Sequence, residues 1–169
     1  MKDSFSFRIG TGYDIHRLSS GRQLILAGVE LPFDQGLVGH SDADVVTHAI
    51  CDALLGAAAL RDIGHHFPNN DPSYAGISSL ELLARVRQLL RQEGYEISNI
   101  DVTVHAQRPR LSSFIDVMCE KLAATLNINL RSISIKAKTN EGLDSVGRSE
   151  AIAASAIALI YRPADSSTP

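Results

Sequence analysis

The stretch SSLELLARVRQLLRQEGYEISNIDVTVHAQ, Ser78–Gln107, decides the fold class because its hydrophobic period changes half-way along. In its first half, apolar residues recur every three or four positions with charged residues between them, which predicts an amphipathic helix that stops at Gly94. In its second half, apolar and polar residues alternate from Ile100 to Ala106, which predicts a half-buried strand ending near Pro109. A helix and a strand in succession are typical of an α/β domain.

The rest of the chain adds further strands. Strands are predicted over Phe5–Tyr13 and over SISIKAKT (132–139), and the segment RQLILAGVELPF (22–33) predicts a hairpin or an edge excursion. The run Ala151–Tyr161 is ambiguous, because its alanines suit a helix while its position after a polar loop suits a strand that pairs back in a hairpin. We favour the strand.

Two further helices are predicted. One begins near Ser41, which would be its N-cap, with Asp44 three residues later as an acidic variant of the capping box. The other covers SSFIDVMCEKLAATLNI (112–128). Because helices and strands alternate, we expect an α/β fold: a single-domain mixed β-sheet with helices packed on one face.

Composition sets bounds on the function. A chain of 169 residues that is 44% hydrophobic can bury one core, so we expect a single domain over 1–162 and a disordered tail over 163–169. The formal net charge of -3 offers no basic excess to neutralise phosphates, which argues against a nucleic-acid partner. The segment MKDSFSFRIG lacks the apolar run of a signal peptide, so no membrane association is expected. Cys51 and Cys119 form no CxxC pair and fit the reduced thiols of a cytoplasmic protein.

The motif GTGYDIHRL, Gly10–Leu18, is a candidate metal site. Asp14 and His16 are two residues apart at the end of a predicted strand, so their side chains point to the same side. A catalytic zinc takes three protein ligands, and His48 on the following helix would complete an Asp/His/His set. The alternative is that Asp14 and His16 are polar residues at a strand end and that His48 has an ordinary hydrogen bond. The residues alone leave both interpretations open.

Other polar residues gather around the same helix. Asp44, His48 and Asp52 recur every four residues as one polar stripe, and His40 and Ser41 precede the helix, where free N–H groups favour anions. The loop AALRDIGHHFPNNDP (58–72) fits a substrate-binding or lid segment, or else a solvated loop whose polar residues cap turns.

A second polar segment lies near the C-terminal end of the predicted strand 132–139. In KAKTNEG (136–142), Glu141 could hold a hard cation such as Mg²⁺, and the Thr139 hydroxyl could donate to a phosphoryl oxygen. Arg110 and Arg148 are candidate phosphate partners, or else ordinary surface charges.

Four blocks of sequence resemble one known family. They are GTGYDIH (10–16), HSDADVVTHAICDALLGAAALRDIGHHFP (40–68), AQRPR (106–110) and KAKTNEG with a later GR (136–142 and 147–148). Together they strongly resemble the 2-C-methyl-D-erythritol 2,4-cyclodiphosphate synthase family of the non-mevalonate isoprenoid pathway. The resemblance runs from about Arg8 to Arg162 in the same order.

The resemblance implies a concrete function. Members convert a small cytidine diphosphate substrate, 4-diphosphocytidyl-2-C-methyl-D-erythritol 2-phosphate, into the cyclic diphosphate and CMP. They are α/β homotrimers with active sites at the subunit interfaces. The implied cofactors are one Zn²⁺ per subunit, held by Asp14, His16 and His48, and Mg²⁺ or Mn²⁺, held by Glu141. His40 and Thr139 match positions that stabilise the transition state.

The resemblance also assigns the substrate contacts. Those near the methylerythritol and phosphate groups are Asp14, His16, His40, Ser41, Asp62, Ile63, Gly64, Phe67, Pro68, Asn69, Asn70 and Asp71. Those near the cytidine and its phosphates are Ala106, Pro109, Arg110, Leu111, Lys138, Thr139, Asn140 and Glu141, and Arg148 matches the arginine of the family's GR element.

Two rival functions are a catalytically silent homologue and a hydrolase, and the sequence also departs from the family pattern at a few positions. Ala43 stands where glycine is common, Asn69 and Asn70 replace the usual Asp-Thr, Arg110 replaces a lysine, and Ser145 stands where an aromatic residue often lines the trimer axis. The rivals are a catalytically silent ligand-binding homologue and a zinc-dependent phosphoester hydrolase. The hydrolase would need a general base, for which Asp44 is the candidate.

Overall fold

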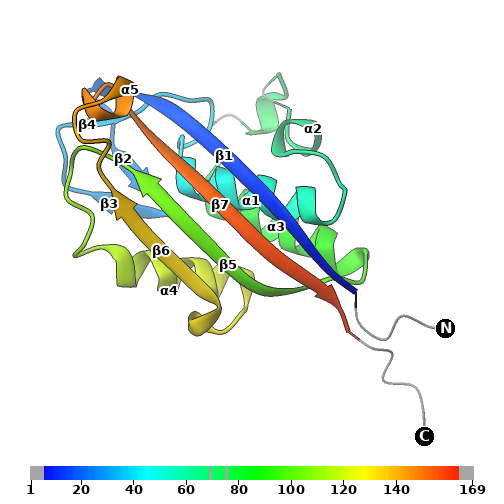
Figure 1. Cartoon of the computed structure of the whole chain (residues 1–169). Helices are drawn as coiled ribbons and strands as arrows, with labels where there is room; N and C mark the ends of the chain where they lie inside the picture. Colours follow the sequence, from blue (N-terminus) through cyan, green and yellow to red (C-terminus); the bar gives the residue numbers. More distant parts are fainter. Residues whose placement is uncertain (1–5, 69, 75, 164–169) are drawn as a thin grey trace, which may run out of the picture.

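The computed structural model describes residues 6–68, 70–74 and 76–163, and its centre is a five-stranded mixed sheet (Figure 1). The strand order is β4-β1-β7-β5-β6, and only β5 and β6 pair in parallel among the strand pairs of these residues. The strands are β1 (Ser6–Ser20), β4 (Gln35–Leu37), β5 (Glu96–His105), β6 (Ile133–Lys138) and β7 (Ala151–Arg162). A separate hairpin joins β2 (Leu24–Leu26) to β3 (Val29–Leu31), as the sequence predicted for 22–33.

Three long helices lie on one side of this sheet (Figure 1). They are α1 (Val45–Ala57), α3 (Ser79–Gln92) and α4 (Ile115–Leu126). The short helices are α2 (Ile63–His66) and α5 (Asp144–Gly147), with single 3₁₀ turns at Pro72–Tyr74 and Leu130–Ser132. A mixed sheet covered by helices on one face was the expected fold. Its expected limits, 1–162, remain a prediction, and residues 164–169 of the expected tail lie outside the described residues.

The order of the layers explains why α1 is apolar on nearly all sides whereas α3 is amphipathic. Helix α1 packs against β1 and β7 on one side and α3 on the other, so nearly all of its residues are buried. Helix α3 packs mainly against α1 and α4 and forms the outer layer, so only one stripe of it is buried. Each fully buried leucine, such as Leu54 or Leu83, contributes about 1.5–3 kcal/mol to the free energy of folding.

Strands β1 and β7 pair along the whole length of β7, and helix α1 lies unusually close to them. A Cβ atom at Gly10 or Gly12 would collide with backbone atoms of α1, so these glycines allow the helix to lie directly on β1. The alanines of β7, including Ala154, Ala156 and Ala158, are buried. Small side chains are what this close packing requires, which explains why an alanine-rich segment is a strand here, as favoured from its position.

Several boundaries differ from the sequence prediction, among them the start of β5, which is Glu96 and not Ile100. Strand β1 continues to Ser20 instead of ending near Tyr13, because it pairs with β7 as far as Arg17 and then with β4. Helix α1 begins at Val45, and its N-cap is Asp44, not Ser41. Among the described residues, no helix is long and apolar enough to cross a membrane.

Candidate metal centre and cavity

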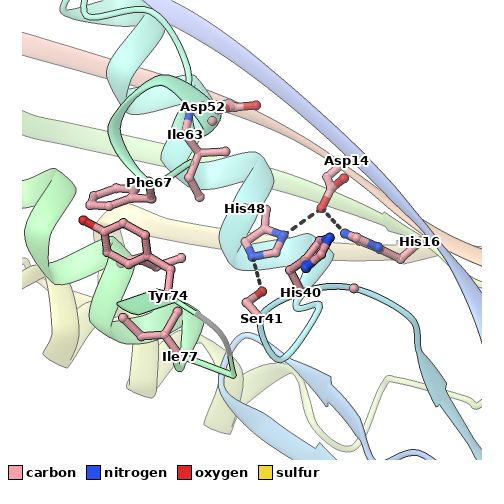
Figure 2. A pocket seen from close by; sticks show the side chains of 13 residues that line it. Asp14, His16, His40, Ser41, His48, Asp52, Ile63, Phe67, Tyr74 and Ile77 are labelled. Atoms are coloured by element: carbon pink, nitrogen blue, oxygen red, sulfur yellow. Dashed lines mark hydrogen bonds and ion pairs between the residues drawn. The ribbon is translucent and has the colours of Figure 1, made fainter. Parts of the chain in front are cut away.

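A cavity of about 280 Å³ lies between β1, the first turns of α1, and the segment around α2 (Figure 2). Polar side chains form one side of it, and apolar side chains form the other. The polar side chains are Asp14, His16, His40, Ser41, His48 and Asp52, and the apolar ones are Ile63, Phe67, Tyr74, Ile77 and Leu82. A pocket with convergent polar groups and an apolar wall can bind a small molecule that has a charged end and a hydrocarbon part.

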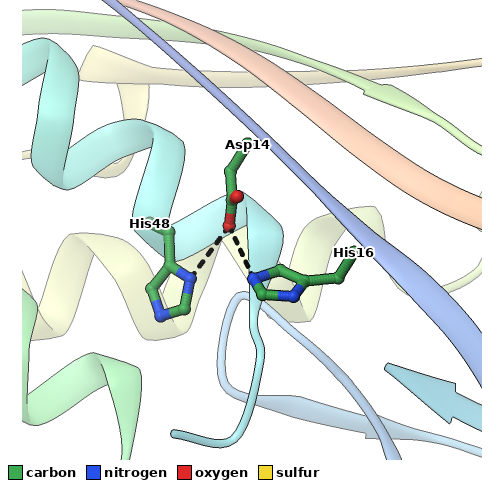
Figure 3. Close-up of side chains that lie close together, drawn as sticks. All are labelled: Asp14, His16 and His48. Atoms are coloured by element: carbon green, nitrogen blue, oxygen red, sulfur yellow. Dashed lines mark hydrogen bonds and ion pairs between the residues drawn. The ribbon is translucent and has the colours of Figure 1, made fainter. Parts of the chain in front are cut away.

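Three of the polar residues converge on one point (Figure 3). Asp14 Oδ2 lies 3.2 Å from His16 Nε2 and 2.9 Å from His48 Nδ1. One ligand atom of each residue lies within 4.8 Å of the others, a grouping that could hold a metal ion. The structure therefore brings together the strand pair and the helical histidine that the sequence could only connect by hypothesis.

The local fold explains why these residues meet. Asp14 and His16 are alternate residues of β1, so both face α1. Gly12 on the same face lets the backbone of α1 approach at Ala49, directly after His48. His48 itself stands in the first turn of α1, with its backbone N–H bonded to the carbonyl of Asp44.

Hydrogen bonds set the charge of Asp14. Burial of this carboxylate opposes its ionisation, but the hydrogen bonds from His16 and His48 outweigh burial and hold the pKa of Asp14 well below its ordinary value. The hydrogen bond to Asp14 raises the pKa of His16, although burial lowers it. Asp14 is thus ionised at neutral pH, as metal binding requires.

The ring of His16 is oriented for metal coordination. Its Nδ1 lies 2.6 Å from the carbonyl oxygen of Val38, which can only accept a hydrogen bond, so Nδ1 carries a proton. Nε2 therefore donates to Asp14 Oδ2 while the ring is protonated, and it has the lone pair that a metal takes once that proton is released. One carboxylate oxygen and two imidazole nitrogens are a donor set that suits zinc and similar divalent cations. The residues present therefore fit a metal centre.

Asp44 belongs to the polar stripe, but it caps α1 and does not line the cavity. It is fully buried, and burial raises its pKa, against the hydrogen bonds that it accepts. Its carboxylate accepts hydrogen bonds from the backbone N–H groups of Ala27, Gly28, Val46 and Thr47 and from the Thr47 hydroxyl. The expectation of a helix N-terminus with free amides at this point is therefore wrong for Val46 and Thr47, which Asp44 caps. Asp44 does not face the cavity either, so it cannot be the general base that a phosphoester hydrolase would need.

Ala43, just before this cap, occupies a special backbone position. Its φ angle is 58°, in the left-handed region that favours glycine, and its side chain is fully buried. This explains why glycine is common at this position in the family pattern. With alanine in this conformation, α1 begins at Val45 and Asp44 is its N-cap.

The segment 58–72 forms the far wall of the cavity, and part of its polarity caps turns. Ile63, Gly64 and Phe67 line the cavity. Asp62 caps α2 by accepting the N–H of His65 at 2.8 Å, and Asp71 accepts the N–H of Ser73 at 2.9 Å. Pro68, Asn70 and Asp71 follow Phe67 along the chain, and none of them lines the cavity. Asn69 lies outside the described residues.

Sequence reasoning missed several residues of the cavity. Asp52 was seen in the polar stripe without a role; it lines the cavity, and its Oδ1 accepts the N–H of Ile63 at 2.8 Å, which ties α2 to α1. Tyr74, Ile77 and Leu82 also line the cavity. Apolar side chains in loops and helix starts carry no chemical signature, so only their position in the fold reveals them.

The predicted site residues of segments 106–111 and 138–141 lie toward the opposite edge of the sheet, after β5 and β6. The row of paired residues Asp14, Ala154, Val104 and Ala137 runs across β1, β7, β5 and β6. Three strand spacings separate Asp14 from β6, a distance of about 14 Å. Lys138, Thr139, Asn140 and Glu141 follow at the end of β6, so a single chain does not bring them to the metal-centre cavity.

These residues form a second group, which we call the β6-end group: Ala106, Pro109, Arg110, Leu111, Lys138, Thr139, Asn140 and Glu141. The N–H of Ala106 donates to the carbonyl of Lys138 at 2.9 Å and joins the two segments. The Thr139 hydroxyl donates to Glu141 Oε1 at 2.5 Å, and both residues are exposed. Arg148 lies on the connection to β7, where its Nε donates to Glu150 at 2.9 Å.

Fold and site together define a class: an α/β protein whose central strand and buried helix bring one carboxylate and two imidazoles to a cavity wall, as in metal-dependent enzymes. Within this class, the sequence profile of the YgbB family matches residues 7–161, and the chain belongs to that family.

Similar proteins agree with this assignment. A curated relative from Desulfosudis oleivorans, named 2-C-methyl-D-erythritol 2,4-cyclodiphosphate synthase, is 55% identical over 153 residues, or 90% of this chain and 91% of the relative. The structure of the bifunctional IspDF from Campylobacter jejuni matches with a TM-score of 0.91 at 39% identity, over 94% of this chain and 43% of that chain. Plasmodium falciparum IspF in its CDP complex matches with a TM-score of 0.83 at 35% identity, over 94% and 97%. The chain thus spans less than half of the Campylobacter protein. The resemblance drawn from the four sequence blocks is confirmed.

Proposed function

We propose that this chain catalyses the metal-dependent cyclisation of 4-diphosphocytidyl-2-C-methyl-D-erythritol 2-phosphate to 2-C-methyl-D-erythritol 2,4-cyclodiphosphate, with release of CMP, in the non-mevalonate isoprenoid pathway. The observation that carries the proposal is the meeting of Asp14, His16 and His48 at a cavity wall. It occurs in a chain whose 55% identical relative bears the name of that enzyme. A further support is the CDP bound by a solved relative, because CDP is the nucleotide part of the proposed substrate.

The reaction forms one P–O bond and breaks another. An oxygen of the substrate's own 2-phosphate attacks the β-phosphorus of its diphosphate, and CMP leaves with the bridging oxygen. A side-chain nucleophile is not needed. The protein must therefore position two anionic phosphates and neutralise their charge as they approach.

The cavity supplies one half of this requirement. Asp14, His16 and His48 would hold a zinc ion, which, when bound, supplies Lewis-acid polarisation of a phosphate oxygen. His40 and Ser41 line the same cavity and would contact the neighbouring phosphate. The apolar wall would exclude water from the methylerythritol carbons. The hydrogen bond from Ile63 to Asp52 would hold that wall in place.

The β6-end group supplies the other half. The segment 106–111 would bind the cytidine, and Lys138 would neutralise phosphate charge. Glu141 would hold Mg²⁺ or Mn²⁺, a hard cation that suits a carboxylate and phosphate oxygens. Thr139 would turn its hydroxyl from Glu141 to a phosphoryl oxygen. Because this group lies about 14 Å from the metal centre of its own chain, it would serve the cavity of a neighbouring subunit.

A homotrimer would bring the two halves together, and the open face of the sheet supports such an assembly. On the face away from the helices, β1 exposes Ile9 at 68% and Tyr13 at 58%, and β7 exposes Ile157 at 45%. Apolar residues gathered on one face of a soluble protein are typical of an interface between subunits. We therefore propose that three copies pack through this face, with one active site at each interface.

One incubation tests the proposed reaction. The protein is mixed with the cytidyl substrate, Zn²⁺ and Mg²⁺, and the products are followed by phosphorus NMR. The expected result is one CMP for each cyclic diphosphate formed. A linear hydrolysed product would instead indicate a phosphoester hydrolase, and substrate binding without turnover would indicate a silent binding homologue. Either result would overturn the proposal.

A further inference from the structure

The side of His48 that faces away from Asp14 contacts Ser41 and also Ser79, a residue that the proposed reaction does not use. His48 Nε2 lies 2.9 Å from the hydroxyl oxygen of Ser79, the first residue of α3. Ser79 is fully buried. Its hydroxyl also hydrogen bonds to Asp42 Oδ1, and its backbone N–H donates to Asp42 Oδ2 at 2.8 Å. A continuous chain of contacts thus runs from Asp42 through Ser79 to His48 and Asp14.

The position of each proton in this chain follows from which groups can donate. A carboxylate only accepts hydrogen bonds, so the single hydroxyl proton of Ser79 points to Asp42. Toward His48, the Ser79 oxygen can therefore only accept, and His48 Nε2 must carry a proton. Nδ1 is then the nitrogen left for a metal: it lies 2.9 Å from Asp14 Oδ2, donates to that oxygen while it carries a proton, and has a free lone pair for coordination once that proton is released.

Ser41 cannot fix the tautomer in the same way. Its hydroxyl oxygen lies 3.2 Å from His48 Nε2 and accepts the N–H of Ala43 at 3.2 Å. Within the part of the chain that the structure describes, its proton has no carboxylate partner, so Ser41 can either donate to Nε2 or accept from it. Of the two hydroxyls near Nε2, only that of Ser79 sets the direction of the hydrogen bond, because only Ser79 is bound to a carboxylate.

We propose that Ser79 and Asp42 are positioning residues that fix the tautomer and ring orientation of His48, so that Nδ1 is presented to the metal. The proposal rests on the metal centre of the proposed function. It assigns a role to α3 as well, because Ser79 at the N-terminus of this outer helix holds His48, a proposed metal ligand of the buried helix α1. Groups that orient a ligating histidine in this way commonly change metal affinity by about 10- to 100-fold when removed.

We call the hydrogen bonds from Asp42 through Ser79 to His48 the relay, and four variants test it. Ser79→Ala removes the acceptor, and Ser79→Thr retains a hydroxyl and should rescue the function. In Asp42→Asn, the amide can present an N–H to the Ser79 oxygen, which turns the Ser79 proton to His48 and favours the wrong tautomer. Thr47→Val is the matched control, because Thr47 is another fully buried hydroxyl that donates to a carboxylate, at 2.7 Å, without contact to His48 Nε2.

Two measurements separate positioning from stability. The first is the zinc dissociation constant, measured by competition with a chelator. Ser79→Ala and Asp42→Asn should weaken zinc binding by about 10- to 100-fold, while Ser79→Thr and Thr47→Val stay within about threefold of wild type. The second is the Nε2 proton of His48 in the zinc-loaded protein, followed by nitrogen-edited NMR. It should exchange slowly with water in wild type and Ser79→Thr and rapidly in Ser79→Ala.

The outcomes distinguish failure of the relay from failure of the metal centre. If Ser79→Ala and Asp42→Asn bind zinc as tightly as wild type, the relay is wrong and the metal centre stands. If Thr47→Val loses as much affinity as Ser79→Ala, the effect is general destabilisation, and the relay is again wrong. If wild type itself binds no zinc, the metal centre fails and the relay fails with it. Selective loss in Ser79→Ala and Asp42→Asn, with rescue by Ser79→Thr, confirms the relay.

Discussion

The two predicted halves of the active site differ in how far a single chain completes them. At the metal centre, Asp14, His16 and His48 are half-buried and contact one another, and second partners fix both histidine rings. In the β6-end group, Lys138, Thr139 and Glu141 are exposed, and the Thr139 hydroxyl bonds only within the group. The metal centre is therefore preorganised by the fold of one chain, whereas Lys138, Thr139 and Glu141 of the β6-end group extend from the surface, and in the described part of the chain only Asn140 of its polar residues lines a cavity. This difference is what a site shared between subunits would produce.

Removal of a metal ligand should have the largest effect. His48→Ala deletes one of three converging ligand atoms, so we expect zinc to be lost and CMP release to fall by about three orders of magnitude or more. Metal content by atomic emission and CMP release by chromatography check this result. Circular dichroism should show a folded protein, since the His48 side chain is not part of the apolar core. Full zinc occupancy in this variant would remove His48 from the ligand set.

Removal of Glu141 should affect the other half alone. Glu141→Gln takes away the carboxylate proposed to hold Mg²⁺, so we expect CMP release to fall by about 100-fold while zinc content is unchanged. Titration of Mg²⁺ into the assay should show a higher metal requirement. If zinc is lost as well, the two halves are not independent and the comparison fails.

A mixture of these two inactive variants sharpens the comparison further. In mixed oligomers, some interfaces pair an intact metal centre with an intact β6-end group. Random mixing in equal amounts should therefore restore about a quarter of wild-type CMP release. A site contained within one chain would restore none, because neither variant chain has both halves.

Disruption of the open sheet face should have a smaller effect. Ile9→Asp places a charge on the apolar face that we propose as the subunit interface, so we expect a smaller particle in size-exclusion chromatography and about tenfold slower CMP release. Zinc content should be retained, since the metal centre lies on the opposite face of the sheet. The control is Gln88→Asp on the exposed side of α3. Unchanged size and rate in Ile9→Asp would place the interface elsewhere.

Much of the fold could be predicted from hydrophobic periods, because these report which face of an element is buried. The amphipathic helix α3 and the strand β6 were predicted close to their observed bounds, and β5 was predicted as a strand from Ile100 although it begins at Glu96. The start of α1 was not, because Ser41 and Asp44 both have the chemistry of an N-cap, and only the tertiary contacts of Asp44 with Ala27 and Gly28 decide between them. The residues Asp14, His16 and His48 carried their own chemical signature, but their convergence depends on how closely α1 lies on β1. Asp52 and Ser79 could not be assigned from sequence, since their partners are distant along the chain.

The smallest effect concerns pH, and its sign depends on whether metal is present. In the metal-free protein, the pKa of His16 is raised above its ordinary value of 6.5 by Asp14, so this contact stabilises the fold fully below pH 6.5 and is lost as pH rises through the raised pKa. The lowered pKa of Asp14 keeps its own contribution present above its ordinary value of 3.8. Relative to His16→Gln, metal-free wild type should therefore lose about 2–4 °C of Tm between about pH 6 and pH 8. With zinc bound, protons compete with the metal for His16, and the same comparison should show stability that rises with pH. The same slope in both states would show that His16 does not bind the metal, and the metal centre would lose one of its three ligands.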